Sequence, residues 1–441
     1  MSNYFKPISI SLSPNVEKDD VGLALNLLIR PWLWRRGKAV RELEESFKNY
    51  LGVKYAFSFN SGRSSLYAIL KALSAVEGLK SGDEILLQAF TCNAVPNPVL
   101  WAGLEPIYVD CNKDDFNIDV EDLKSKITSK SKIVIIQHTF GMPADMDEIR
   151  AVCAERNLIL IEDCAHSLGA EYNGIKVGIQ SRVAFFSFSR DKIISSVYGG
   201  MAVTNDDKLG EALRQAQGKF GMPSQIWILQ QILHPILLNY FILPIYNFVD
   251  LGKLFLVAAQ MAHVLSKAVS WKEKRGLMPD YFPKSLPNAM ATMAMNQLGK
   301  IEKFNLHRQN VAEYYYKELA SFAPPSQTLR RASNASAAQA KFILPKQFDT
   351  RKNVFLRFTV MHPKAHEIIY EAWHKQNILL GDWYTTPIAP FDTKIEDVKY
   401  VSGSCPNAEY LAKRTLNLPT HINISNKDAE RVVNFLKKYV K

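Results

Sequence analysis

One acid and one lysine, each delivered by a short apolar run, could together do amine chemistry. Asp163 ends the run 160–163, and the run 185–188 leads to Lys192. A lysine amine can bond covalently to an aldehyde cofactor, and a carboxylate can hold the proton on a pyridinium nitrogen, so the pair suits pyridoxal phosphate. On spacing alone two ordinary alternatives stay open, because an aspartate after a strand often caps a helix and a single lysine is commonly a solvated surface charge.

Strands that alternate with helices must position this pair. An apolar run that ends in an acid predicts a buried strand with Asp163 at its carboxyl end, where sites in open α/β sheets gather. The alternation predicts a sheet with helical crossovers. The predicted strands are 55–59, 84–88, 105–109, 132–137, 158–162 and 201–204, and the predicted helices are 20–33, 38–51, 64–75, 119–127, 145–156 and 206–217.

Several further motifs surround the pair in a fixed order. In that order they resemble the DegT/DnrJ/StrS group of pyridoxal phosphate-dependent sugar aminotransferases, from about Pro14 to Val440 with one interruption. The resemblance implies an aspartate-aminotransferase-like α/β fold, with a mostly parallel central sheet in a large domain and a smaller α/β C-terminal domain. The motifs that carry it are 60–66, 89–94, 141–146, 160–167, 185–192 and 198–201.

Composition limits the class of protein. The chain has 441 residues, of which 22% are charged and 47% hydrophobic, so we expect a globular protein of two or so domains. Its five cysteines include no CxxC pair, and its N-terminus lacks the plan of a signal peptide, so we expect a reducing cytoplasm and no metal site. The net charge of +11 comes without a nucleic-acid-binding motif, and an anionic ligand or an anionic membrane surface explains it equally well.

Three segments are expected. Residues 1–219 should form an N-terminal arm and the large cofactor-binding domain, and 277–441 should form the small domain, with a strand at 354–358 and helices at 364–375 and 427–439. Between them, 220–276 is an apolar helical insertion that typical family members lack.

The resemblance assigns cofactor contacts to particular residues. The strand-to-helix turn at Gly62 lets backbone N–H groups approach a phosphate, and Arg63 adds a full charge where the family usually has threonine. By likeness, Ser187 also binds the phosphate, His166 lies near the ring hydroxyl, and Phe90 lies against the pyridine ring. Without the resemblance Phe90 would be ordinary core.

Substrate contacts are less closely defined. Arg35 and Arg36 replace a Thr-Gln pair common in the family, and they are either a fork for substrate phosphate oxygens or a solvated basic loop. Tyr384 belongs to a loop, 381–387, that loosely resembles the family's substrate-side loop. Pro283 stands where the family offers an asparagine to the cofactor phosphate of the neighbouring subunit. Arg63 or Lys284 could instead supply a positive charge to that phosphate.

The insertion 220–276 invites two interpretations. Between 220 and 266 its only charged residues are Asp250 and Lys253, and four basic residues cluster between 267 and 275. Two prolines, at 235 and 244, should break the run into pieces too short for one confident membrane span. The pieces could lie in a membrane interface beside anionic headgroups, making the protein peripheral on the inner face of the cytoplasmic membrane, or they could form an enlarged dimer interface or a buried helical subdomain.

By resemblance the protein is an enzyme and a homodimer. Lys192 would hold pyridoxal phosphate and act as general base, and Asp163 would keep the ring nitrogen protonated. The amino donor would be glutamate, and the acceptor a keto sugar on a nucleotide or lipid diphosphate, in polysaccharide or amino-sugar biosynthesis. The lysine disfavours the family's dehydratases, which carry histidine there. The alternative is a membrane-associated scaffold or binding module that kept the fold and lost turnover.

Overall fold

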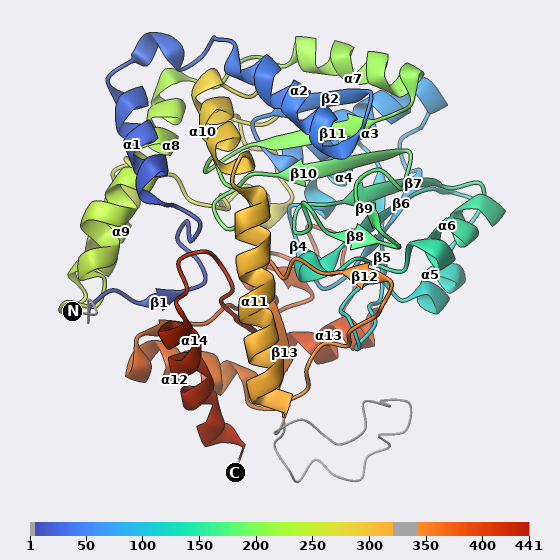
Figure 1. The fold of residues 1–441 in the computed structure, drawn as a ribbon. Helices are drawn as coiled ribbons and strands as arrows, with labels where there is room; N and C mark the ends of the chain where they lie inside the picture. Colours follow the sequence, from blue (N-terminus) through green and yellow to red (C-terminus); the bar gives the residue numbers. More distant parts are fainter. Residues whose placement is uncertain (1–4, 321–341, 441) are drawn as a thin grey trace.

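The computed structural model describes residues 5–320 and 342–440, and a seven-stranded sheet lies at its centre (Figure 1). All strands of this sheet run parallel except β11, which is antiparallel to both of its neighbours. The predicted α/β architecture with a mostly parallel sheet is confirmed. Across the sheet the strands are β2 (Tyr55–Phe59), β11 (Gly200–Thr204), β10 (Val183–Ser187), β7 (Ile159–Asp163), β6 (Ser131–Gln137), β3 (Glu84–Gln88) and β5 (Glu105–Val109).

The register between β7 and β10 places the two chemical motifs side by side. Asp163, the last residue of β7, pairs in register with Phe185 on the parallel strand β10. Strand β10 ends two residues later at Ser187, and the chain then turns through Lys192. Both motifs therefore leave the sheet at the same carboxyl edge, which is where ligands bind in such sheets.

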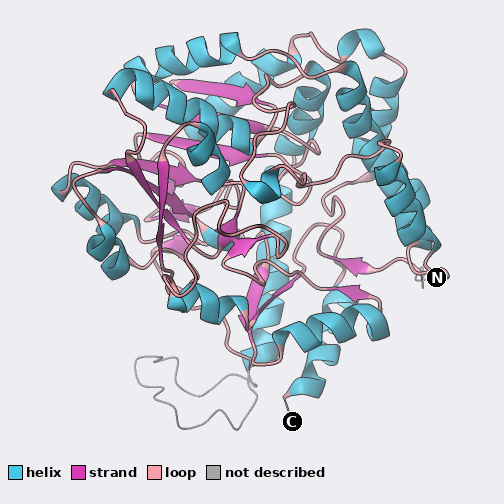
Figure 2. Ribbon diagram, turned by 180° about the vertical axis from the view of Figure 1, so that it is seen from behind, coloured by secondary structure: helices cyan, strands magenta, loops and turns pink. Residues whose placement is uncertain are grey.

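Helices cover both faces of the sheet, as the view from behind also shows (Figure 2). One face packs against α3 (Gly62–Glu77), α7 (Asp207–Lys219) and apolar residues of the C-terminal region. The opposite face packs α1 (Lys18–Leu28), α2 (Ala39–Leu51), α8 and α10 (Asn288–Leu298) over β10 and β11, and α5 (Val120–Lys126) and α6 (Met146–Glu155) over β5 to β7.

Two predicted elements differ from the structure for local reasons. The helix expected over 20–33 ends at Leu28, and Pro31–Leu33 forms a separate 3₁₀ turn, because a proline N atom cannot donate to the preceding turn. The strand expected over 354–358 is absent from the described residues there. Phe355 takes a left-handed backbone conformation with φ of 44°, so the extended strand β13 begins only at Phe358 and runs to Met361.

The C-terminal region reaches back to the sheet edge at two places. Strand β15 (Ile388–Ala389) pairs in parallel with β4 (Thr91–Cys92), and this brings the loop around Tyr384 to the cavity side. Strand β14 (Ile378–Leu379) pairs in parallel with β1 (Ile8–Ser9) of the N-terminal arm. The rest of the region consists of α11 (Ile301–Ala320), α12 (Ala365–Gln376), α13 (Pro406–Ala412), α14 (Asn426–Leu436) and β16 (Thr415–Leu418), which pairs with β13. That 277–441 forms a domain of its own stays a prediction.

The insertion contains one continuous helical run rather than the separate pieces that its prolines predict. Helix α8 (Gln225–Leu237) continues through Pro235 into a π-helical turn, Leu238–Ile242, and a 3₁₀ turn, Leu243–Ile245. The prediction of a break at Pro235 is therefore wrong. The side-chain amide of Asn239 donates to the Pro235 carbonyl oxygen at 2.8 Å, so this carbonyl oxygen has a partner where the π-helical turn follows.

The two halves of the insertion differ in burial. The run Gln225–Ile245 is long and apolar enough to cross a membrane, but 56% of it is buried inside the protein. Trp227, Ile228 and Ile232 pack with α1 and α10, so α8 is a core helix of this fold. Helix α9 (Leu251–Met261) instead exposes much of its apolar surface at the edge of the molecule (Figure 1), through Leu254, Phe255, Val257 and Met261.

The basic cluster after the insertion is partly neutralised. Lys272 pairs with Asp280 at 3.1 Å, and Lys274 pairs with Asp392. Lys267 and Arg275 are exposed. The expected attraction of four basic residues to anionic headgroups is therefore reduced to these two.

A buried arginine ties the N-terminal arm to the segment that carries Lys192. Arg308 of α11 is 0% exposed, and its Nη2 donates to Asn15 Oδ1 at 2.6 Å and to the Ile193 carbonyl oxygen at 3.3 Å. The side-chain amide of Asn15 donates in turn to the carbonyl oxygens of Lys192 and Ile193. The arm thus holds the backbone at Lys192 in place through one buried, hydrogen-bonded cation.

We expect Asn15→Ala to lower the free energy of unfolding by about 1.5–3 kcal/mol, because it removes a hydrogen bond to a buried charge. Urea denaturation measures this change. The control is Asn423→Ala, which removes hydrogen bonds from an exposed amide to the carbonyl oxygens of Pro14 and Val16 in the same arm. We expect a loss below about 1 kcal/mol for the control, since neither group is a buried charge. Equal losses in the two variants would contradict the role given to Arg308.

Candidate functional site

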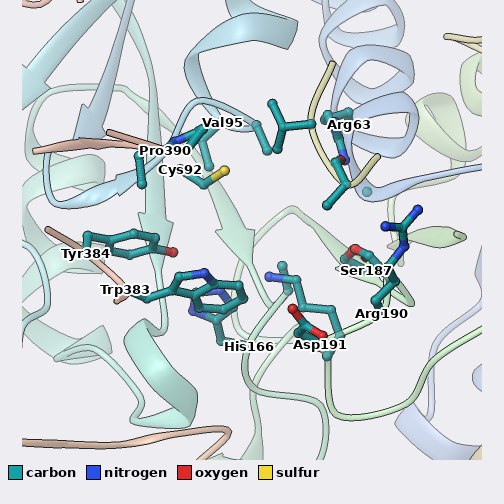
Figure 3. Close-up of a pocket in the computed structure, with 18 of the residues that line it drawn as sticks. Arg63, Cys92, Val95, His166, Ser187, Arg190, Asp191, Trp383, Tyr384 and Pro390 are labelled. Carbon is teal, nitrogen blue, oxygen red and sulfur yellow. Dashed lines mark hydrogen bonds between the residues drawn. The ribbon is translucent and has the colours of Figure 1, made fainter. Parts of the chain in front are cut away.

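A cavity opens at the carboxyl edge of the sheet, where β7 and β10 end (Figure 3). Its walls come from five parts of the chain, of which four are the ends of β6, β7 and β10 with the turn 189–198, the N-terminus of α3, the segment around β4, and the C-terminal loop 382–391. A fifth part is residues 268–269, which follow the apolar helices of the insertion. Asp163, His166, Ser187 and Lys192, all predicted as site residues, line this cavity together.

Lys192 lies in the turn after β10, with its amine over an aromatic ring. The Nζ atom is 4.7 Å from the centre of the Trp383 ring, and its backbone N–H donates to the Ser189 carbonyl oxygen. Burial lowers the pKa of the Lys192 amine to about 8, and the nearby Asp163 carboxylate opposes part of that shift. A lysine amine with this pKa is available as a base and nucleophile near neutral pH.

Asp163 is held by the turn that follows its strand. One carboxylate oxygen, Oδ1, accepts a hydrogen bond from the Ala165 N–H at 2.9 Å. Burial raises the pKa of Asp163 to about 6. The carboxyl group is therefore mostly ionised at pH 7, and a cationic ring nitrogen placed beside it would favour the charged form further.

His166 is a neutral ring in an aromatic stack. Its Nδ1 accepts a hydrogen bond from the Phe140 N–H at 3.3 Å, and its ring stacks on Trp383 with 5.2 Å between the ring centres. Burial holds the pKa of His166 well below its usual value. His166 therefore acts as a neutral hydrogen-bonding group rather than as a cation.

The first turn of α3 and two serines form a cup for an anion. Ser61 caps the helix by accepting from the Ser64 N–H, and Gly62 approaches β10 so closely that a Cβ atom there would lie 2.9 Å from the Ser187 Cβ. Ser187 Oγ and Ser189 Oγ lie 2.8 Å apart beside this turn. A helix N-terminus with free N–H groups and neighbouring hydroxyls suits a phosphate, so these residues fit the cofactor that the resemblance implies.

Arg63 lines the cavity, but its charge already has a partner. Its guanidinium group forms a buried ion pair with Glu273, which is 0% exposed, and donates to the Ala268 carbonyl oxygen at 3.3 Å. The guanidinium also lies over the Phe282 ring. Arg63 therefore joins α3 to the end of the insertion, a contact that the sequence did not suggest.

Phe90 is not among the residues that line the cavity, and a contact of its ring with the pyridine ring stays a prediction. Its side chain is 0% exposed and packs edge-on against Tyr384, with ring centres 5.4 Å apart. The backbone at Phe90 is left-handed, with φ of 63°, and this turns the ring back among core aromatic residues. Cys92, two residues later, lines the cavity instead.

Arg35 and Arg36 are exposed and do not line the cavity of this chain. Trp34 beside them is buried, and its Nε1 donates to the Leu27 carbonyl oxygen at 2.7 Å. Anchoring Trp34 inward leaves the two arginines on the outer side of the loop. Within one chain their exposure favours the solvated-loop alternative, and a contact with substrate phosphate stays a prediction.

The other substrate-side predictions have mixed outcomes. Tyr384 lines the cavity together with Asp382 and Trp383. Pro283 and Lys284 do not line it, and the backbone of Lys284 instead exchanges hydrogen bonds with Asn60. The sequence therefore located the C-terminal wall of the site but not the group that replaces the family's asparagine.

Several cavity residues were missed by the sequence analysis. Arg357, on the C-terminal side, stacks over Trp383 at 3.4 Å and lies 4.0 Å from Asp191. Arg190 and Asp191 line the cavity just before Lys192. The charges of Arg190 and Asp191 beside the candidate lysine could have marked them as cavity residues. The distant side chains that contact them could not be identified from the sequence.

Comparison with known proteins identifies the relatives of this chain. A sequence model of the DegT/DnrJ/EryC1/StrS aminotransferase family matches residues 15–229 and 282–437. An uncharacterised protein of Methanocaldococcus jannaschii is 27% identical over 431 residues, which are 97% of this chain and 96% of that protein. The GDP-perosamine synthase of Caulobacter vibrioides is 32% identical over 265 residues, which are 60% of this chain and 68% of the synthase.

Solved structures share the fold at lower identity. Helicobacter pylori PseC, an aminotransferase involved in the biosynthesis of pseudoaminic acid, superposes with a TM-score of 0.72 at 21% identity over 99% of each chain. DesV of S. venezuelae superposes with a TM-score of 0.70 at 22% identity, over 96% of this chain and 95% of that one. These likenesses confirm the predicted fold class.

The lowered pKa of Lys192 leads to a pH prediction. A protonated amine cannot attack an aldehyde. The rate at which cofactor-free enzyme captures pyridoxal phosphate should therefore rise about tenfold per pH unit at low pH, and it should level off above the Lys192 pKa of about 8. Stopped-flow absorbance measures this rate. Asp163→Asn removes the anion that supports the charged lysine, so its profile should shift to lower pH. A rate that keeps rising to the ordinary lysine pKa of 10.5 would contradict the burial of the amine.

Proposed function

Because the chain belongs to the DegT/DnrJ/EryC1/StrS aminotransferase family, we propose that it transfers an amino group from an amino acid, glutamate, to a keto sugar in amino-sugar biosynthesis. It is a pyridoxal phosphate-dependent aminotransferase. The observation that carries the proposal is the position of Lys192, whose buried amine shares one cavity with Asp163. Family membership also makes the non-catalytic scaffold the weaker alternative.

Each site residue has a role that its surroundings support. Pyridoxal phosphate, when bound, supplies a ring that accepts electrons and a carbon that carries the amino group. Lys192 Nζ takes the proton from Cα of the amino donor, since its pKa of about 8 leaves much of the amine neutral near that pH. Asp163 holds the proton on the ring nitrogen. The first turn of α3 and Ser187 would hold the phosphate, and neutral His166 with Trp383 would limit the access of water to the cavity.

The sugar would enter beside the C-terminal loop. Asp382, Tyr384 and Thr385 line the cavity on that side, and they offer a carboxylate and hydroxyls of the kind that bind sugar hydroxyls. Phe391 also lines the cavity and is 80% exposed, so an apolar side chain stands at its lip. We propose a diphosphate-linked keto sugar, and incubation with nucleotide-linked and lipid-linked keto sugars would identify the carrier.

We expect Lys192→Ala to abolish the half reaction with glutamate, because the variant lacks the amine that moves the proton. The half reaction changes the visible spectrum of the enzyme, so it can be measured without knowing the sugar substrate. Asp163→Asn should slow it by at least about a hundredfold, since a neutral amide cannot stabilise a protonated ring nitrogen.

Lys284→Ala is the matched control, because Lys284 contacts Asn60 through its backbone and does not line the cavity. It should react like the wild type. A Lys192→Ala variant that converts glutamate at the wild-type rate would refute the mechanism.

We also propose that the exposed apolar face of α9 contacts a membrane. Leu254, Val257 and Met261 are 64%, 51% and 75% exposed, and burial in a bilayer interface is worth about 1.5–3 kcal/mol for each fully buried side chain. The alternative occupant of this face is a second copy of the chain, as a homodimer of this family would provide.

Replacing those three residues by glutamate should abolish co-sedimentation with anionic liposomes at low salt. The control is Asn49→Glu/Gln215→Glu/Asn310→Glu, which adds the same charge at exposed positions away from α9 and should still bind. A wild type that stays in the supernatant contradicts the membrane proposal. If light scattering then shows a wild-type dimer and a monomeric glutamate variant, α9 is a subunit interface.

A further inference from the structure

Of four basic groups at or beside the cavity, three have an acidic group near them and one does not. Arg63 pairs with Glu273, and Arg357 lies 4.0 Å from Asp191. Lys192 has the Asp163 carboxylate near it. Arg190 has no carboxylate within ion-pair distance in the described part of the chain.

Arg190 is nevertheless a buried cation. It is 8% exposed, and its Nη2 donates to the carbonyl oxygen and the Oγ of Ser266 at 2.7 and 2.6 Å. Its Nε is buried without any hydrogen-bond partner. Burial lowers the pKa of this guanidinium. A buried charge without a counter-charge is costly, and so a bound anion is the expected partner.

The position of Arg190 indicates which anion. Its side chain extends past Ser187 toward Arg63 (Figure 3), at the end of the cavity formed by the first turn of α3. Helix N–H groups, the Ser187 and Ser189 hydroxyls and one unpaired guanidinium therefore gather at one place. A dianionic phosphate monoester satisfies all of them.

Building on the proposed function, we propose that Arg190 is the cationic contact of the cofactor phosphate and that Arg63 is not. Arg63 is a positioning residue: its pairing with Glu273 attaches the end of the insertion to α3. In this proposal the positive charge beside the cofactor phosphate comes from the same chain that carries Lys192.

The end of the insertion closes the phosphate end of the cavity. We call residues 266–273 the strap. Tyr198 Oη donates to the Lys267 carbonyl oxygen at 2.7 Å, and the side-chain amides of Asn93 and Asn97 donate to the Glu273 carbonyl oxygen at 3.1 and 2.8 Å. With Arg190 on Ser266 and Arg63 on Glu273, both ends of the strap are fixed to residues around the phosphate cup.

The test compares two ligands that differ only in the phosphate. Dissociation constants of pyridoxal phosphate and of pyridoxal are measured by absorbance titration of the cofactor-free protein. Arg190→Gln should weaken the binding of pyridoxal phosphate by about tenfold to a hundredfold, the effect of losing one charge-assisted contact. Its affinity for pyridoxal should stay within about threefold of the wild type, and this also reports that the variant is folded.

The matched control removes the Arg63 pair without changing the net charge. Arg63→Gln/Glu273→Gln should keep the affinity for pyridoxal phosphate within about threefold of the wild type. Glu273→Gln combined with Arg190→Gln frees the Arg63 charge next to the cup, so it should recover part of the lost affinity for the phosphate-bearing ligand.

Three outcomes would overturn the proposal. The first is that Arg190→Gln weakens the binding of pyridoxal and of pyridoxal phosphate equally. The second is that Arg63→Gln/Glu273→Gln loses more affinity for pyridoxal phosphate than Arg190→Gln does. The third is that Arg190→Gln leaves the cofactor affinity unchanged but raises the KM for a diphosphate-linked sugar, which would assign Arg190 to the substrate. Because the test measures binding, its result is independent of turnover. A protein that fails to transfer an amino group from glutamate would refute the proposed function and leave the phosphate contact standing.

Discussion

Burial of charge at one edge of the sheet is the constraint on which the rest of the structure depends. A lysine that must be partly neutral near pH 8 and a carboxylate that must stay ionised have to share a site with little water. Desolvation gives Lys192 its low pKa, but the same desolvation penalises every other ion nearby. The fold supplies partners for Arg63 and Arg357 from distant parts of the chain, whereas the described residues leave Arg190 without a carboxylate.

Those partners explain why three separate segments converge on one edge of the central sheet. The N-terminal arm supplies Asn15, which links the Lys192 backbone to Arg308. The C-terminal region supplies Arg357 and the Trp383 ring, and pairing of β15 with β4 holds that region against the sheet. The insertion supplies Glu273 through the strap. The insertion is thus joined to the cavity by its C-terminal end, although its sequence showed no sign of a contact with the site.

The sequence predicted what depends on local patterns and missed what depends on distant contacts. Apolar runs gave β2, β3 and β5 with their observed bounds, because buried parallel strands are marked by composition alone. The positions of Asp163 and Lys192 followed from the ends of such runs. The burial of Phe90 was not foreseen, because it goes with a left-handed backbone at the residue before the strand β4 that pairs with β15. The sequence could not distinguish the roles of Arg63, which follows the glycine turn, and Arg190, which precedes the lysine. The difference is that Arg63 pairs with Glu273, a residue more than 80 positions beyond either arginine.

The pairing of the arm with the C-terminal region also sets an order of assembly during synthesis. Strand β1 begins at Ile8 but pairs with Ile378, so it cannot take its place until most of the chain has left the ribosome. His421, still later in the chain, donates through Nε2 to the Ser9 carbonyl oxygen at 2.6 Å. Asn15 follows in the same arm and holds the carbonyl oxygen of Lys192. The anchoring of the reactive lysine is therefore among the last events of folding, and a truncated chain would carry the lysine without its complete support.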